Sequence, residues 1–320
     1  MWIWIIFIAI IIVFLALDLG VFHKNDHVIR SKEAATWTAI LVTVALSFSG
    51  VIYWLFSTNL VENPTNLTPG TAVLKYITGY LIELSLSIDN VFVIAVIFSA
   101  FAIPPIYQHR VLFWGILGAI VFRALMILFG VALINKIDWI IYVFGVFLLY
   151  TAFRMLRADE HEFNPKESIV FKQITKVFPI TTHLDGNHFF VRRLGINAAT
   201  PLFVALIIIE LTDILFALDS IPAILAITAD PFIVFSSNIL AILGLRSMYF
   251  LISRMLAKFR FINYSLVVIL AFVGVKMLLS HHVHIPEWLS LSIIVVSLGG
   301  GILASIYIPE KEEASEATTQ

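Results

Sequence analysis

Apolar residues run along this chain in nine long blocks, and polar residues gather in the connections between the blocks. A window of about 19 residues, the length with which a helix crosses a bilayer, delimits each block. The pattern therefore predicts an all-α, polytopic membrane protein with about nine transmembrane helices. The predicted helices cover approximately residues 2–20, 34–57, 73–101, 111–133, 138–155, 199–228, 231–253, 262–280 and 287–308.

The connections are short, with one exception at residues 156–198, which are polar, mixed in charge and soluble in character. The chain ends in a polar stretch, 310–320, that we predict to be a disordered tail. The transmembrane domain is thus expected to cover residues 1–309. The first residues lack the positive charges of a cleavable signal peptide, so the first block is interpreted as a retained membrane helix.

The composition agrees with a membrane location. Hydrophobic residues make up 60% of the chain and charged residues only 13%, about half the charged share of soluble domains. The mean hydropathy is +0.99. A net charge of −1 gives no indication of a nucleic-acid partner, and the absence of cysteine excludes disulfides and thiolate metal ligands.

Lysine and arginine predict the orientation. One set of loops holds only Lys75 and Lys136. The opposite set holds Lys24, Arg30, Lys32, Arg110, Arg154, Arg157, Lys166, Lys172, Lys176, Arg192, Arg193, Arg254, Lys258, Arg260 and Lys311. Positive residues remain on the cytoplasmic side of membrane proteins. The N-terminus is therefore predicted outside, and the C-terminus and the 156–198 loop in the cytoplasm.

Part of the sequence occurs twice. The stretch from Gly115 to Leu125 matches the stretch from Asn238 to Met248, with Arg123 and Arg246 at equivalent places. The third to fifth helices therefore repeat as the sixth to eighth, and the predicted orientation makes the two copies inverted. Inverted repeats are common in secondary transporters, where the substrate site lies between the copies near the midplane. The two copies cover about 73–157 and 199–280.

The third and sixth helices carry acidic residues deep in apolar surroundings. A carboxylate at the centre of a bilayer costs about 3 kcal/mol, so five of them require a compensating interaction. Together with an amide and a hydroxyl, they form an oxygen ligand set that suits Mn²⁺, Ca²⁺ or Mg²⁺. The predicted metal-site residues are Glu83, Asp89, Asn90, Glu210, Asp213, Asp219 and Ser220.

Helical geometry distributes these groups over several faces. Residues on one face are Glu83 with Asn90, and Glu210 with Asp213 and Ser220. Asp89 and Asp219 point elsewhere, so straight helices would not aim every group at one ion. Either the helices are broken, or the ligands form two shells or two sequential sites. Pro222 favours a break in the sixth helix, because its ring clashes with the carbonyl four residues earlier and it has no N–H to donate to that carbonyl.

Three deep cations accompany the five carboxylates: Arg123, Arg246 and Lys276. The deficit of two positive charges equals one divalent ion. We expect the arginines to be supporting counter-charges or gate elements, and a purely structural pairing of carboxylates with arginines remains open. Asp18, near the predicted cytoplasmic end of the first helix, is either a point of access for the metal or a solvated helix end.

Several stretches are similar to the TerC family of integral membrane proteins, in particular its Alx-like branch. They are Gly79–Glu83 with Asp89–Phe92, Gln108–Leu112, His188–Arg193, Ala199–Leu202, Glu210–Ile224 and Thr228–Val234. The resemblance covers nearly the whole chain. It implies a bacterial inner-membrane protein of the LysE-like transporter superfamily with manganese efflux as its activity. It also implies links, in some members, to metal loading of secreted proteins, to membrane-protein biogenesis and to tellurium resistance.

The sequence thus predicts an Mn²⁺ exporter that works by alternating access, with Mn²⁺ placed ahead of Ca²⁺ and Mg²⁺ as the transported ion. No phosphate-binding GxxxxGK[ST] motif occurs, so an ion gradient should supply the energy, with protons carried by Glu83 or Glu210. We expect no enzyme activity and no prosthetic group. The expected partners are the lipid bilayer, the divalent metal ion and protons as a counter-ion, with no nucleic acid among them. A channel, or an accessory or tellurium-resistance factor without transport, remains an alternative, and the oligomeric state is left open.

Overall fold

Long helices make up almost all of the structure, which is a computed structural model of the chain. It describes residues 2–20, 31–63, 66–137, 139–157, 171, 173, 179–181, 184–193, 196–253, 261–279, 283 and 285–307. Within them the helices are α1 (Trp2–Gly20), α2 (Ser31–Ser57), α3 (Pro69–Ala100), α4 (Pro105–Lys136), α5 (Ile140–Arg157), α7 (Pro201–Leu225), α8 (Pro231–Ile252), α9 (Ile262–Leu279) and α10 (Glu287–Tyr307).

Each of the nine predicted blocks is confirmed as a helix. By length and composition, seven of the described helices are able to cross a membrane, whereas the apolar parts of α1 and α9 are shorter. The largest error in the predicted bounds is at α4, which begins at Pro105 rather than at residue 111. Proline fits the first helical position because its missing N–H has no partner there. Four helices begin in this way, at Pro69, Pro105, Pro201 and Pro231.

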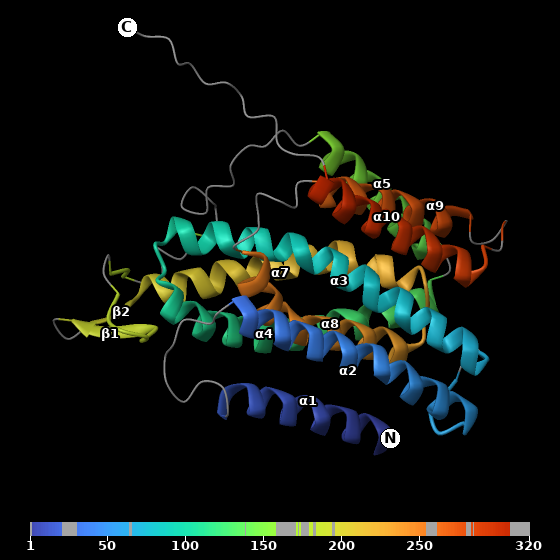
Figure 1. The fold of residues 1–320 in the computed structure, drawn as a ribbon, viewed down its shortest axis with the longest axis horizontal. Coiled ribbons are helices and arrows are strands. Elements are labelled where there is room, and N and C mark those ends of the chain that lie inside the picture. Colours follow the sequence, from blue (N-terminus) through green and yellow to red (C-terminus); the bar gives the residue numbers. More distant parts are fainter. Residues whose placement is uncertain are drawn as a thin grey trace, which may run out of the picture.

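Helix α8 lies at the centre of the bundle. Of its 22 residues, 17 are buried, which is typical of a helix surrounded by others on all sides. It packs against α3, α2 and α4, while α4 also packs along α7. Helices α5, α9 and α10 form a group on one side of this core, and α1 lies on the opposite side, beyond α2 (Figure 1).

The outward faces of the bundle are apolar. Exposed large side chains include Phe129 on α4, Tyr150 on α5 and Val296 on α10. In water such surfaces would be a liability, but in a bilayer they face acyl chains. Several polar residues that the sequence places inside the membrane, among them Glu83, Arg123 and Asp213, are instead buried between helices, where their partners must be other protein groups.

The predicted break in the sixth helix is wrong. Helix α7 runs without interruption from Pro201 to Leu225 and contains Pro222 within its last turn. The proline removes one backbone donor, but the residues around it, from Ser220 to Leu225, are all buried. Tight packing against neighbouring helices holds such a segment helical in a membrane despite the lost bond. Helix α3 is also continuous, from Pro69 to Ala100.

A short β-hairpin precedes α7 and was not predicted. Strand β1 (Phe190–Arg193) pairs antiparallel with β2 (Ile196–Ala199), with Phe190 opposite Ala199. The hairpin lies at the end of the bundle where α3 ends and α4 and α7 begin (Figure 1). We call this the hairpin end. Strands of four residues within a polar loop leave little periodic signal in the sequence.

Candidate functional site

A buried arginine of α4 joins α3 to α7 in the middle of the bundle. The side chain of Arg123 is only 1% exposed. Its Nε donates to Asp213 Oδ2 over 3.2 Å and its Nη2 donates to Asp213 Oδ1 over 2.9 Å. Its Nη1 donates to Glu83 Oε1 and, over 3.3 Å, to Ser220 Oγ. A two-pronged contact of this kind is the strongest form of an arginine–carboxylate pair.

Two amide side chains complete the coordination of the carboxylates. Asn238 of α8 donates from Nδ2 to Glu83 Oε2 over 2.8 Å, and Asn90 of α3 donates from Nδ2 to Asp213 Oδ1 over 3.1 Å. Every carboxylate oxygen of the pair therefore accepts at least one hydrogen bond. The Oδ1 atoms of Asn90 and Asn238 are themselves buried without a hydrogen-bond partner among the described residues.

These residues form what we call the central polar cluster. It carries two carboxylates and one guanidinium, so its formal charge is −1 when all three groups are ionised. Desolvated charges are stable only with well-placed partners, and the remaining negative charge makes the cluster attractive to a cation. Its members are Glu83, Asn90, Arg123, Asp213, Ser220 and Asn238.

Helix geometry explains which acidic groups enter the cluster. Asp213 and Ser220 are two helical turns apart on one face of α7, and both contact Arg123. Asp219 lies on another face, where it accepts a hydrogen bond of 2.9 Å from Thr151 of α5. As predicted, Asp219 therefore lies on a different face of α7 from Asp213 and Ser220. With the helices unbroken, the ligand set is divided rather than gathered at one point.

Glu210 contacts neither Arg123 nor Thr151 in the hydrogen bonds described above, and lies instead beside α4. Its side chain packs against Gly118 of α4, so closely that a Cβ atom at residue 118 would overlap the Glu210 carboxylate. Its Oε2 atom is buried and has no hydrogen-bond partner among the described residues. Glycine at 118 is therefore what allows α4 to pass the carboxylate.

The three predicted counter-charges have different surroundings. Arg123 binds Glu83 of α3 and Asp213 of α7. Arg246 is buried in α8, 8% exposed. Lys276 of α9 instead pairs with Glu287 of α10 over 3.1 Å and donates to Ser290 over 3.0 Å.

The cluster around Glu287 lies at the end of the bundle opposite the hairpin end. Lys75 of α3 also pairs with Glu287, over 3.1 Å, and donates to the Ile227 carbonyl over 2.5 Å. Lys75, Lys276 and Glu287 together form what we call the lysine clasp. It ties α3, α9 and α10 to the α7–α8 connection.

Two predicted positions lie outside what can be described. Asp89 and Asp18 belong to α3 and α1, but their side chains are not among the described ones. Within the part of the chain that the structure describes, no three His, Cys, Asp or Glu side chains come close enough to hold a metal ion. The acidic side chains that the structure describes are therefore spread over several places.

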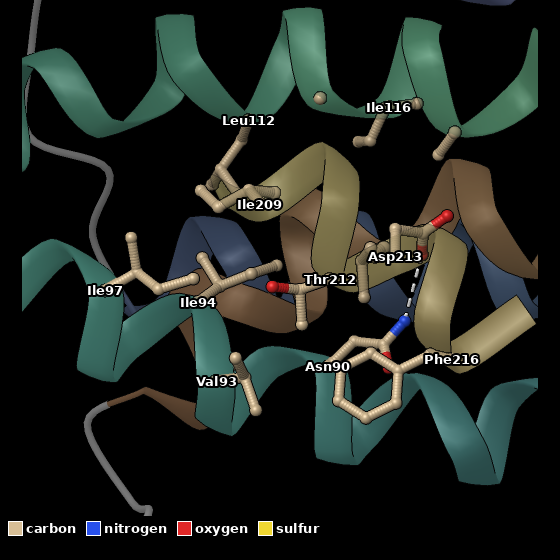
Figure 2. Close-up of a pocket in the computed structure, with 13 residues that line it drawn as sticks. Asn90, Val93, Ile94, Ile97, Leu112, Ile116, Ile209, Thr212, Asp213 and Phe216 are labelled. Carbon is tan, nitrogen blue, oxygen red and sulfur yellow. Dashed lines mark hydrogen bonds between the residues drawn. The ribbon is translucent and has the colours of Figure 1, made fainter. Parts of the chain in front are cut away.

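A small cavity adjoins the cluster on the side of the hairpin end. Its volume is about 20 Å³, room for roughly one water molecule. Asn90 and Asp213 line its polar edge, and Ile94, Leu112 and Ile209 line the apolar part between helices α3, α4 and α7 (Figure 2). The cavity thus borders one of the two clustered carboxylates, that of Asp213.

The sequence of this chain is similar to a known protein family and to several of its members. The model of the integral membrane protein TerC family matches residues 68–313. The chain belongs to the TerC family. It is 48% identical over 314 residues to an uncharacterized membrane protein, STKORF319, of Myxococcus xanthus, covering 98% of this chain and 95% of that one. It is 43% identical over 303 residues to Alx of Escherichia coli (strain K12), described as a candidate membrane-bound redox modulator, covering 94% and 92%. No solved structure matches.

Sequence reasoning missed two contributors to this region. Asn238 appeared only as the start of the repeated stretch, and Thr151 did not stand out at all. An amide within a strongly apolar helix was the available signal for Asn238. Thr151 gave none, because a threonine in a membrane helix satisfies its hydroxyl locally as often as across helices.

Proposed function

We propose that this TerC family protein exports a divalent metal cation, with Mn²⁺ as the leading substrate, by alternating access at the central polar cluster. One observation carries the proposal. Glu83 and Asp213 come from opposite halves of the chain, are at most 8% exposed and meet at one guanidinium. Buried carboxylates in membrane helices are expensive, and they mark ion pathways more often than they serve as scaffolding.

The packing of the helices supports two inverted copies, α3–α5 and α7–α9. If α3, α4 and α5 correspond to α7, α8 and α9, the α3–α8 contact of one copy has its equivalent in the α7–α4 contact of the other. Both contacts are extensive. At the α5–α9 crossing the relation is reciprocal: a Cβ on Gly145 would lie 3.0 Å from the Gly274 carbonyl, and one on Gly274 would lie 3.0 Å from the Gly145 carbonyl.

The spacing of acidic residues in the two copies pairs Glu83 with Asp213. Glu83 and Asp213 each stand six residues before an aspartate, Asp89 and Asp219. Asp213 is therefore the better counterpart of Glu83, although Glu210 begins the second acidic stretch. Two equivalent carboxylates, one from each copy, are the arrangement expected where repeats meet around a substrate.

Ligand chemistry supports a hard divalent cation. The cluster and its surroundings offer carboxylate, amide and hydroxyl oxygens, which Mn²⁺, Mg²⁺ and Ca²⁺ accept. The choice of manganese rests on the family resemblance. We further propose the bacterial inner membrane as the location, with the hairpin end facing the cytoplasm, because the arginines of α5 and β1 lie at that end.

Export needs energy. Moving two positive charges out against an inside-negative potential costs about 4.6 kcal/mol per 100 mV. Proton exchange would supply this energy if one carboxylate carried the proton. Glu210 is the better candidate, since Glu83 is fully engaged by Arg123 and Asn238 while Glu210 keeps an unpartnered oxygen.

A role without transport is the second candidate, and the complete pairing of Glu83 and Asp213 favours it. In that case the cluster would hold helices together for an accessory or tellurium-resistance factor. The redox role named for the Escherichia coli relative would have to proceed without thiols here, because this chain contains no cysteine.

The test is manganese tolerance and cellular manganese content in a bacterial strain that lacks its own exporters. The native chain should lower both manganese sensitivity and manganese content. Glu83→Gln and Asp213→Asn should abolish the effect at equal protein level in the membrane, whereas Glu62→Gln, at an exposed loop position, should not. Retained protection by both cluster variants would refute transport through this cluster and favour the second candidate.

A further inference from the structure

Arg123 occupies the positions that a bound cation would need. Its guanidinium contacts both oxygens of Asp213 and one oxygen of Glu83. The second Glu83 oxygen is held by Asn238. A metal ion ligated between the two carboxylates would need the space that the guanidinium fills, and the two positive charges would repel each other, so the guanidinium and the metal compete for the same place.

We propose that Arg123 is a built-in competitor of the transported cation, which holds the two carboxylates in the cation-free protein and is displaced when the cation binds. The inference deepens the proposed function and rests on it. Arginine suits this role because its charge is permanent and its fork matches a carboxylate. A lysine or histidine would be able to lose its charge and so leave the carboxylates uncompensated.

Charge counting explains why displacement is required. With Arg123 in place the cluster carries −1, and adding a divalent ion without moving the arginine would give +1 in a low-dielectric interior. With the guanidinium withdrawn, two carboxylates and one divalent ion are neutral. Neutral arrangements are much cheaper to bury than charged ones.

A second, independent observation points to a cation ligand at this place. The amide oxygens of Asn90 and Asn238 are buried without a hydrogen-bond partner among the described residues, in side chains 4% and 0% exposed. Unpaired buried acceptors are costly. Asn90 also lines the cavity between the cluster and the hairpin end (Figure 2). In this arrangement the amide nitrogen of Asn90 faces Asp213, so an arriving cation would bind the oxygen of Asn90 once the amide turned.

The competitor has two consequences for transport. It weakens cation binding, because displacing Arg123 consumes part of the binding energy, and it thereby permits release on the far side. It also neutralises half of the carboxylate charge when no cation is bound, which eases the return of the empty protein. Removing the guanidinium should therefore make binding tighter and turnover slower.

The direct test is Mn²⁺ binding to the purified full-length protein in detergent, followed by paramagnetic resonance of free Mn²⁺. Arg123→Met should bind Mn²⁺ about tenfold more tightly than the native protein, which corresponds to about 1.4 kcal/mol, and should export it at least about tenfold more slowly in vesicles. Arg157→Met, which removes an exposed arginine at the end of α5, should change neither. Equal or weaker binding by folded Arg123→Met would overturn the proposal.

A chemical variant covers the case in which Arg123→Met does not fold. The chain has no cysteine, so Arg123→Cys introduces a single thiol. Attaching an ethylammonium group through a disulfide should weaken Mn²⁺ binding, whereas attaching a neutral methyl group should not, and bound Mn²⁺ should protect the thiol. If both reagents had the same effect, the positive charge at residue 123 would not compete. If the native protein neither bound nor moved Mn²⁺, the proposed function itself would fail.

Discussion

Asn238 and Glu83 are joined by a hydrogen bond of 2.8 Å, from the amide nitrogen of one to the carboxylate of the other. Both side chains are fully buried. The bond connects the central helix α8 to α3 and fixes the one Glu83 oxygen that Arg123 does not contact. It therefore sets the direction in which the carboxylate points.

Replacing Asn238 with leucine should destabilise the protein and disable the cluster. The substitution removes the donor and leaves a buried carboxylate oxygen unsatisfied, which costs about 1 to 3 kcal/mol. Thermal unfolding in detergent and manganese tolerance in cells measure the two effects. Ser292→Ala, which removes an exposed side-chain hydrogen bond on α10, is the control and should be close to neutral. A stable, active Asn238→Leu variant would show that this bond is dispensable.

Gly118 should be far less tolerant of alanine than Gly115, one turn earlier on α4. A Cβ at residue 118 overlaps the Glu210 carboxylate, while one at residue 115 would lie 3.5 Å from Ile209, an ordinary contact. Because the overlapping atoms are the end of a flexible side chain that can move aside, the cost should lie near the lower end of the about 1 to 3 kcal/mol that overpacking brings. Unfolding midpoints should fall for Gly118→Ala and remain nearly unchanged for Gly115→Ala.

The cause can be tested by adding a second change. If the collision with Glu210 is responsible, Glu210→Ala should restore most of the stability lost in Gly118→Ala, because the shorter side chain makes room. Additive losses in the double variant would place the damage elsewhere. The pair is close enough for such a coupling to be measured.

Loss of the shared carboxylate in the lysine clasp should loosen the end of the bundle opposite the hairpin end. Glu287→Gln leaves the ammonium groups of Lys75 and Lys276 mostly buried without their acidic partner. Breaking buried pairs by removing one side costs up to about 3 to 5 kcal/mol, and the partial exposure here reduces that figure. Thermal stability should fall more than in Glu62→Gln, whose carboxylate is exposed. Equal stability of the two variants would contradict a structural role for the clasp.

Asp230 should make stability fall as pH rises. It caps α8 through the N–H groups of Phe232 and Ile233, and burial raises the pKa of its carboxyl, against those bonds and nearby Lys75. The folded protein then binds more protons than the unfolded one, so unfolding free energy declines from about pH 4, the ordinary aspartate pKa, up to the raised value. Asp230→Asn keeps a capping side chain and should remove this slope in pH-dependent unfolding. An unchanged slope in that variant would assign it to other groups.

The helices themselves were predictable because a membrane-spanning helix needs a long apolar run, and each of the nine left one. The faces of α7 were also predictable, since Asp213 and Ser220 are seven residues apart and Asp219 is not in phase with them. What the sequence left undecided was which neighbour each face meets. The contact of Asp219 with Thr151, and of Glu210 with Gly118, depends on helix rotation and packing.

The break expected at Pro222 shows a limit of local reasoning. A proline disfavours the helix by its own chemistry, yet its surroundings decide whether the chain bends away. Here every residue from Ser220 to Leu225 is buried, so leaving the helix would expose backbone groups where no water is available. The tertiary structure overrides the local preference.

Uptake of Mn²⁺ into everted membrane vesicles tests the central claim most directly. With an acidic vesicle interior, vesicles holding the native chain should accumulate Mn²⁺ faster than those with Glu83→Gln or Asp213→Asn, and collapsing the pH gradient should slow uptake. Mg²⁺ and Ca²⁺ in excess would show by competition which ion the cluster prefers. Uptake by the two variants at the native rate would contradict a cation site built on Glu83 and Asp213.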